Sequence, residues 1–81
     1  MPSVKTYTVN ERMFLLMNIL QEKELIKFRQ DFLNVIDLKK QNFRKITMGE
    51  ASFTVEHIRL ACEYYDVNAN WVLGFDTKMF R

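Results

Sequence analysis

The chain has 81 residues, a length that predicts a single domain and leaves no room for a separate sensor or catalytic domain. Its hydrophobic fraction of 48% includes seven Phe and three Tyr and supports a compact core, but two Gly and one Pro are too few for the turns of a β-sandwich or barrel. Twelve Lys and Arg against ten acids give a net charge of +2, and the single cysteine excludes an intrachain disulfide and an all-cysteine metal site.

No apolar run approaches the roughly 20 residues of a membrane span. The N-terminal stretch also lacks the charged-then-apolar order of a signal peptide. We therefore expect an all-helical cytoplasmic domain with no membrane partner. Residues 1–8 are expected to form a flexible arm, residues 1–9 are the one place where a short strand could occur, and residues 75–81 form a C-terminal tail. Met79 and Phe80 in this tail either pack back on the core or extend an interface.

The first helix is expected to run from about Val9 to about Lys23. Thr8 and Glu11 fit the capping-box pattern at its start, in which each side chain accepts a hydrogen bond from the other residue's backbone. No glycine, proline or cap marks the end of this helix, so an extension to Ile26 stays open.

This helix carries an unusually broad apolar face. The residues spaced i, i+3, i+4 and i+7 are Met13, Leu16, Met17 and Leu20, and the flanking apolar residues are Phe14, Leu15 and Ile19. Such a face predicts a central helix. We favour packing against the chain's own core, with contact to a partner subunit as the alternative.

A second helix is expected around residues 28–33, followed by a tight corner. Phe28 and Phe32 are four residues apart and should share one face, with Leu25 and Leu33 beside them. The apolar residues of the corner are Val35, Ile36 and Leu38, and they are interrupted by Asp37. This group is too short to form a helix of its own.

A third helix is expected over about residues 39–48. Phe43 and Ile46 are its only bulky apolar residues and should anchor it through one side. Gly49 follows the last turn, where a helix C′ position favours a residue that tolerates positive φ. The remaining surface of this helix carries Lys39, Lys40, Gln41, Arg44 and Lys45.

Positive charge is concentrated on this part of the chain. Six Lys and Arg and two acids lie between Lys27 and Met48, a net charge of +4, whereas the rest of the chain sums to −2. A basic surface on one element is typical of a phosphate-facing surface. A solvated helix face is the alternative.

Two further helices are expected after the glycine. Thr54 is a natural N-cap for the fourth helix, and Asn68 for a short fifth helix that Gly74 ends. The expected buried stripe of the fourth helix is Val55, Ile58, Ala61, Cys62 and Tyr65, and the fifth helix contains Trp71, Val72 and Leu73. Trp71 is expected to be a core residue.

Candidate catalytic groups are scarce. His57 is the sole histidine and is expected to be a surface or capping residue, because a metal or catalytic role needs convergent partners. Cys62 is expected to be a small core residue. The chain has no glycine-rich phosphate loop, no paired carboxylate site and no nucleophile beside a base. We therefore expect neither an enzyme nor a cofactor, a metal or a small-molecule substrate.

The order of these features resembles the phage-repressor-like (XRE-type) helix-turn-helix domain, especially the small stand-alone regulators. The resemblance covers roughly Glu11 to Phe80. Three of its marks are the two-helix unit at 28–48, the glycine that ends this unit at position 49, and residues 53–56 at the start of the fourth helix. The strongest mark is the segment 67–74, which together with Met79 and Phe80 is similar to the family's ending V-N-x-x-W-L-L-x-G…M-F. It implies a compact, lambda-repressor-like bundle of about five short helices.

The chain departs from the family pattern at two positions. Leu33 stands where the family usually has a small residue, and Asp37 stands where it usually has glycine at the corner. Because Asp tolerates the left-handed conformation better than most residues, the corner is expected to survive. Leu33 either splays the two helices or points elsewhere.

The resemblance implies a sequence-specific, repressor-like transcription regulator that binds double-stranded DNA as a homodimer, with residues 39–48 in the major groove. The implied base contacts are Lys39, Lys40, Gln41, Arg44 and Lys45, and the implied phosphate contacts are Lys27, Arg29, Asn42, Ser52 and Thr54. We hypothesise that Gln41 and Arg44 contact bases, while Lys39 and Lys45 act mainly through phosphates. The alternative is a protein-interaction adaptor or an antitoxin- or anti-repressor-like module on the same fold.

Overall fold

A computed structural model describes residues 8–81, and every regular element in this part of the chain is helical. The elements are α1 (Val9–Glu22), α2 (Arg29–Val35), α3 (Lys40–Thr47), α4 (Val55–Tyr65) and α5 (Ala69–Val72). Extended backbone in the described residues pairs only at one isolated antiparallel bridge, between Val67 and Phe80. The prediction of an all-helical fold with about five short helices is confirmed. The arm and any strand predicted within residues 1–7 lie outside the described residues.

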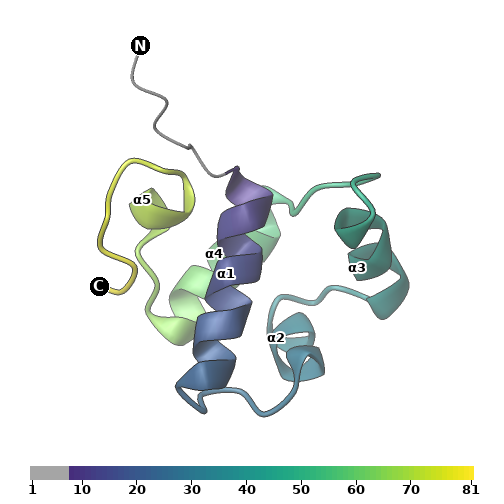
Figure 1. Cartoon of the computed structure of the whole chain (residues 1–81), viewed down its shortest axis with the longest axis horizontal. Helices are drawn as coiled ribbons and strands as arrows, with labels where there is room; N and C mark the ends of the chain where they lie inside the picture. The colour runs from purple at the N-terminus through teal and green to yellow at the C-terminus, as the bar shows by residue number, and fades with distance from the viewer. Residues whose placement is uncertain (1–7) are drawn as a thin grey trace.

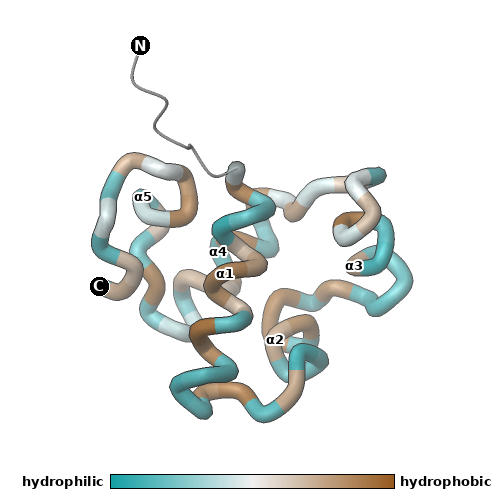
Figure 2. Tube along the Cα trace, viewed as in Figure 1, coloured by the Kyte–Doolittle hydropathy of each residue, from teal (hydrophilic) through white to brown (hydrophobic). Residues whose placement is uncertain are grey.

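The helices are arranged around α1 and α2. In Figure 1, α1 runs through the middle of the molecule, α2 and α3 lie on one side of it, and α5 and the C-terminal segment lie on the other. α2 contacts α1, α3 and α4, whereas α5 contacts α1 and α4. Figure 2 shows hydrophobic colour along α1 and α2 and mostly hydrophilic colour on α3. α3 therefore lies at the edge of the bundle.

The start of α1 is fixed by the predicted capping box. The Thr8 hydroxyl oxygen accepts a hydrogen bond from the Glu11 N–H at 3.1 Å, and the Glu11 carboxylate accepts one from the Thr8 N–H at 3.0 Å. The helix ends at Glu22, and Glu24 takes a left-handed conformation (φ +60°) two residues later. The possible extension of this helix to Ile26 is therefore wrong.

The central stripe of α1 faces the chain's own core. Its four fully buried residues are Met13, Leu16, Met17 and Leu20. Among the flanking residues, Phe14 and Ile19 are half-buried and Leu15 is exposed. The favoured interpretation of this face is thus confirmed for the stripe.

The apolar face predicted for the second helix is wrong at two of its four positions. Phe28 is 61% exposed and Leu25 is 58% exposed. Phe28 is the N-cap of α2 and has extended backbone, so it is not in helical register with Phe32. The Asp31 carboxylate holds this start by accepting a hydrogen bond from the Phe28 N–H at 2.9 Å. In the preceding loop the buried residue is Ile26 instead of Leu25.

The corner between α2 and α3 is formed by the residue that the sequence analysis singled out. Asp37 is left-handed, with φ +56°. The Leu38 N–H donates to the Leu33 carbonyl at 2.9 Å across the corner. The predicted tolerance of Asp at this position is confirmed. Leu33 is 3% exposed and belongs to the core, while α2 and α3 remain in contact.

The expected buried stripe of α4 is wrong at its first position. Val55 is 83% exposed. The core at this end is filled instead by Phe53, which is buried in the loop that leads into α4. Ala61 and Cys62 are buried as predicted, and Ile58 and Tyr65 pack against the core from its edge.

The C-terminal tail packs back on the domain. The Asn68 N–H donates to the Met79 carbonyl at 2.8 Å, and the Arg81 N–H donates to the Asp66 carbonyl at 3.0 Å. The Arg81 guanidinium also pairs with the Asp66 carboxylate at 2.9 Å. Met79 and Phe80 are half-buried against the core, which decides between the two alternatives for these residues. α5 itself ends at Val72, one residue before the predicted end.

Trp71 is 4% exposed, as predicted, and the Arg12 guanidinium carbon lies 5.1 Å from the centre of its ring. We expect Trp71→Ala to lower the free energy of unfolding by about 3–5 kcal/mol, because truncating a buried aromatic residue leaves a cavity. Urea unfolding measures this change. Tyr64→Ala is the matched control, because this α4 aromatic residue is mostly exposed. A Trp71→Ala protein as stable as the control variant would contradict the assignment.

A candidate nucleic-acid interface on helix α3

α3 is attached to the domain through one side. Ile46 is its only fully buried residue, and Phe43 is half-buried with its ring 5.8 Å from that of Phe14 on α1. The N-cap, Lys39, has extended backbone and makes no side-chain capping hydrogen bond. Gly49 follows the helix with φ +80°, which confirms its predicted role as the residue that ends it. The remaining surface of α3 is exposed to solvent.

The five residues predicted to contact bases are all exposed, and they are Lys39, Lys40, Gln41, Arg44 and Lys45. Within residues 8–81, ion pairs are formed by Arg59 with Glu56 and Glu63 and by Arg81 with Asp66. None of these pairs involves a cation of α3. The cations of this helix therefore form no direct ion pair with an acid of residues 8–81.

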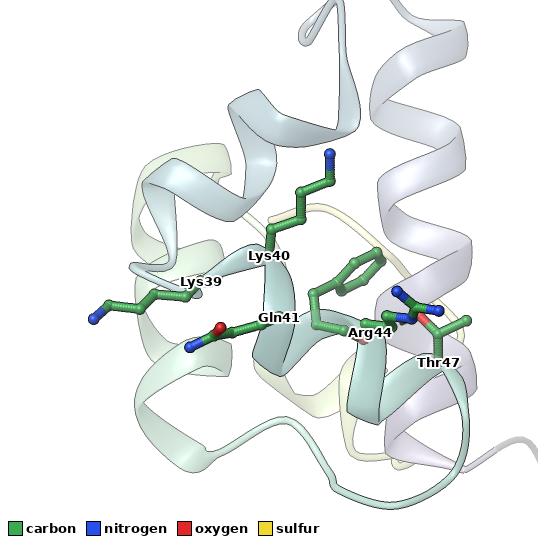
Figure 3. Close-up of a pocket in the computed structure, with 6 residues that line it drawn as sticks. Lys39, Lys40, Gln41, Arg44 and Thr47 are labelled. Atoms are coloured by element: carbon green, nitrogen blue, oxygen red, sulfur yellow. Dashed lines mark hydrogen bonds between the residues drawn. The ribbon is translucent and has the colours of Figure 1, made fainter.

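The side chains on α3 diverge from the helix. In Figure 3, Lys39 and Gln41 extend to one side, Lys40 extends to another, and Arg44 extends toward Thr47. Gln41 and Arg44 are three residues apart, yet their polar ends point in different directions. The two side chains can therefore reach different base pairs of one duplex. Together with Lys39, Lys40, Phe43 and Thr47 they line a hollow of about 760 Å³, which we call the α3 hollow.

A second hollow of about 670 Å³ lies between α3 and the loop that leads into α4. It brings together three of the five predicted phosphate contacts, Asn42, Ser52 and Thr54. The other residues that line it are Asp37, Leu38, Lys39, Lys45, Ile46, Glu50, Ala51 and His57. Two cations, two acids and the hydrogen-bonding side chains of Asn42, Ser52, Thr54 and His57 are thus combined beside α3.

The other two predicted phosphate contacts lie apart from this hollow. Lys27 and Arg29 are at the start of α2, which Figure 1 shows near the C-terminal end of α1. The Arg29 guanidinium donates a hydrogen bond to the Asn18 side chain on α1 at 3.1 Å. The Lys27 ammonium lies 5.5 Å from the centre of the Phe28 ring. Neither cation lines a hollow beside α3.

Asn10 holds the loop between α3 and α4. Its side-chain oxygen accepts a hydrogen bond from the Phe53 N–H at 3.1 Å, and its side-chain nitrogen donates to the Ser52 hydroxyl oxygen at 3.4 Å. Because this oxygen acts as the acceptor, the Ser52 hydroxyl proton is still available to donate to a ligand. The sequence analysis missed Asn10, and its place in the first turn of a helix gives no signal for a contact with a loop 42 residues away.

His57 completes a capping box at the start of α4. The His57 N–H donates to the Thr54 hydroxyl oxygen at 3.2 Å, and the Thr54 N–H donates to His57 Nδ1 at 3.0 Å. The predicted capping role is confirmed. Since Nδ1 is the acceptor, the proton of the neutral ring is on Nε2. Burial lowers the pKa of His57, and the nearby carboxylates of Asp37 and Glu56 oppose this effect.

Other candidate reactive groups belong to the core. Cys62 is buried, and burial raises the pKa of its thiol. Burial also raises the pKa of Tyr65 to about 12, and its ring stacks on Phe32 with centroids 5.8 Å apart. In residues 8–81, no three His, Cys, Asp or Glu side chains are grouped so that they could hold a metal ion. No helix of this region has the length and apolar character to cross a membrane.

The burial of His57, which lowers its pKa, makes stability depend on pH. As the pH falls below the ordinary histidine value of 6.5, the unfolded chain binds a proton before folded His57 does, because the folded pKa is lower. We expect the free energy of unfolding to fall between pH 7.5 and 5.5. In His57→Gln the decrease should be smaller, because Gln supplies an acceptor that does not titrate. Urea unfolding at both pH values tests this, and equal decreases in the two proteins would refute the role of His57.

The geometry of α3 and its two hollows is the basis for any functional assignment. Comparisons of this chain with models of protein families, with curated proteins and with solved structures found no match. The resemblance to XRE-type regulators therefore depends on the residues and spacings quoted above.

Proposed function

We propose that the chain is a sequence-specific regulator of transcription that binds double-stranded DNA, with α2, the Asp37 corner and α3 as a helix-turn-helix unit. One observation carries the proposal. α3 is anchored on one side by Ile46 and Phe43. On its other sides the helix and its N-cap expose four cations and two amides, and none of the cations forms an ion pair within the described residues. A helix of this kind fits the major groove of B-DNA, which is about 12 Å wide.

Base recognition is assigned mainly to Gln41 and Arg44. A glutamine amide suits the N6 and N7 positions of adenine, and a guanidinium suits the O6 and N7 positions of guanine. Lys39, Lys40 and Lys45 supply mobile point charges, which are suited to phosphates as well as to guanine. Since the Gln41 and Arg44 side chains diverge (Figure 3), they would contact different base pairs.

Phosphate binding is assigned first to the hollow between α3 and the α4 loop. The Asn42 amide and the Ser52 hydroxyl proton would donate to phosphate oxygens, and Lys39 and Lys45 would supply charge. The Thr54 hydroxyl oxygen already accepts the capping hydrogen bond, so its proton is the group left for a phosphate. Lys27 and Arg29 would contact a more distant phosphate, because they lie at the far end of α2.

A homodimer is part of the proposal, and the face formed by α4 and α5 is its proposed interface. A groove of about 500 Å³ on this face is lined by apolar residues that include Val55 and Leu73, both exposed. Arg59, Glu63 and Arg81 lie at the same groove. Because Arg59 is paired with Glu63 and Arg81 with Asp66, two copies related by a two-fold axis could join the apolar parts of this groove without burying an unpaired charge.

The same face also supports the second candidate function, an adaptor that binds another protein and has little affinity for DNA. Exposed apolar residues that flank charges are typical of interaction surfaces. The two functions differ in how they depend on salt. A DNA-binding protein loses affinity steeply as the salt concentration rises, whereas an adaptor shows little affinity for duplex at any salt concentration.

Four single substitutions test the role of α3. Gln41→Ala or Arg44→Ala should cost roughly 1–3 kcal/mol on a preferred duplex and weaken the preference at one or two base pairs. Lys39→Ala or Lys45→Ala should weaken all duplexes alike and reduce the salt slope by about one unit. Binding to a selected and a random duplex at several salt concentrations measures both effects.

The random duplex is the control for base recognition in this experiment. If all four variants weakened the selected and the random duplex equally, base recognition by α3 would be refuted. If none of them changed duplex binding, the adaptor function would be favoured instead.

Val55→Glu tests the proposed dimer. The substituted position is 83% exposed at the first residue of α4, so folding should be preserved, but a buried carboxylate should disfavour the interface. Sedimentation should show a shift from dimer to monomer, with weaker binding to a two-fold duplex site. Leu15→Glu on α1 is the control, because it places the same charge on the alternative partner face. Dissociation by Leu15→Glu alone would move the interface to α1.

A further inference from the structure

The α3 hollow has an apolar floor and a cationic rim. Phe43 and Thr47 contribute apolar groups to its lining. In Figure 3, Lys40 and Arg44 extend in different directions and Thr47 lies beside Arg44. The alkyl parts of long cationic side chains commonly cover apolar surface while their charged ends stay in solvent. All six lining residues belong to α3 or to its N-cap. The hollow is therefore part of the surface of the helix that is proposed to enter the major groove.

The ring of Phe43 is held in place by neighbouring aromatic rings. Phe43 packs against Phe14 with ring centroids 5.8 Å apart and an interplanar angle of 57°. Phe14 in turn makes an edge contact with the buried ring of Phe53, at 5.6 Å. Aromatic pairs at these separations favour defined relative orientations. The half-buried ring of Phe43 therefore presents a fixed apolar edge to the hollow.

Thr47 is the last of the residues that line the hollow. Its hydroxyl donates a hydrogen bond to the Phe43 carbonyl, four residues earlier, at 3.0 Å. This bond fixes χ1 of a side chain that already has few allowed rotamers. With the hydroxyl bound to the helix backbone, the methyl group is the part of Thr47 that a ligand in the hollow would touch.

We propose that the α3 hollow receives the C5-methyl group of a thymine, which makes Phe43 and Thr47 specificity-determining residues for one A·T pair. This inference depends on the proposed function. The cationic rim complements the charge of DNA, and thymine alone among the four bases presents a methyl group in the major groove. Arg44 and Lys40 at the rim would then position the phosphates or base edges beside that thymine.

The test uses the full chain and a duplex that it selects from a random library. Each thymine of this duplex is replaced in turn by deoxyuridine, which differs only by the absence of the methyl group. At one position we expect the Kd to rise about fourfold, the value for one buried methylene-sized group. Replacements elsewhere should change the Kd little.

Thr47→Ser identifies the protein partner of that methyl group. This variant keeps the hydroxyl and its hydrogen bond to the Phe43 carbonyl but removes the methyl group. The fourfold effect of deoxyuridine at the sensitive position should shrink toward one in Thr47→Ser. It should be unchanged in Thr77→Ser, the matched control, because Thr77 is an exposed residue of the C-terminal tail.

The outcomes separate this inference from the function on which it depends. If the chain binds its selected duplex but tolerates deoxyuridine at every position, the methyl site is refuted and the DNA-binding function stands. An undiminished deoxyuridine effect in Thr47→Ser also refutes it, because another residue would then contact the methyl group. If no duplex is enriched and none binds at any salt concentration, the proposed function fails and the methyl site fails with it.

Discussion

The position of α3 depends on the ring of Phe14. This half-buried residue of α1 contacts Phe43 on α3 and Phe53 in the following loop, with ring centroids 5.8 and 5.6 Å away. Phe53 continues the series to His57 on α4, at 6.2 Å. Aromatic packing thus connects four segments, and with the buried Ile46 it orients a helix that the rest of the bundle barely covers. The candidate interface is built on this packing.

The cations of α3 and α4 differ in whether they form ion pairs. Arg59 on α4 donates hydrogen bonds to both Glu56 and Glu63, so its charge is largely neutralised within its own helix. The cations of α3 have no such partners within residues 8–81. The unpaired positive charge is therefore concentrated on α3, although the net charge of the chain is only +2. Such a distribution orients a protein as it approaches a polyanion.

Local patterns predicted most of the fold. The capping box of α1, the Thr54 N-cap, the core stripe of α1 and the glycine after α3 depend on residues within a few positions of one another, where helical geometry fixes which side chains meet. Leu25, Phe28 and Val55 were predicted wrongly because they lie in or beside loops, where the helical period no longer applies. The exposed basic face of α3 could be predicted, since two apolar anchors define its buried side.

The contacts that place the candidate site could not be predicted from periodicity. Asn10 holds Ser52 and Phe53 across more than 40 residues, and the Phe14 contact with Phe43 spans 29 residues. Asn10 has a counterpart of the same type in Asn18, and Phe14 is one of several apolar residues that flank the core stripe of α1. Tertiary packing selects them, so only the structure identifies them.

Three corners of the chain place residues other than glycine in the left-handed region: Glu24, Asp37 and Asp66. This conformation costs roughly 1 kcal/mol or more for a residue with a Cβ atom. The two glycines of the chain occupy the other left-handed positions, at 49 and 74. A small domain has a free energy of unfolding of about 5–15 kcal/mol, so the summed conformational cost of these three residues is a substantial fraction of it. Glycine at those corners would remove this cost, and the fold could then tolerate more destabilising substitutions on α3.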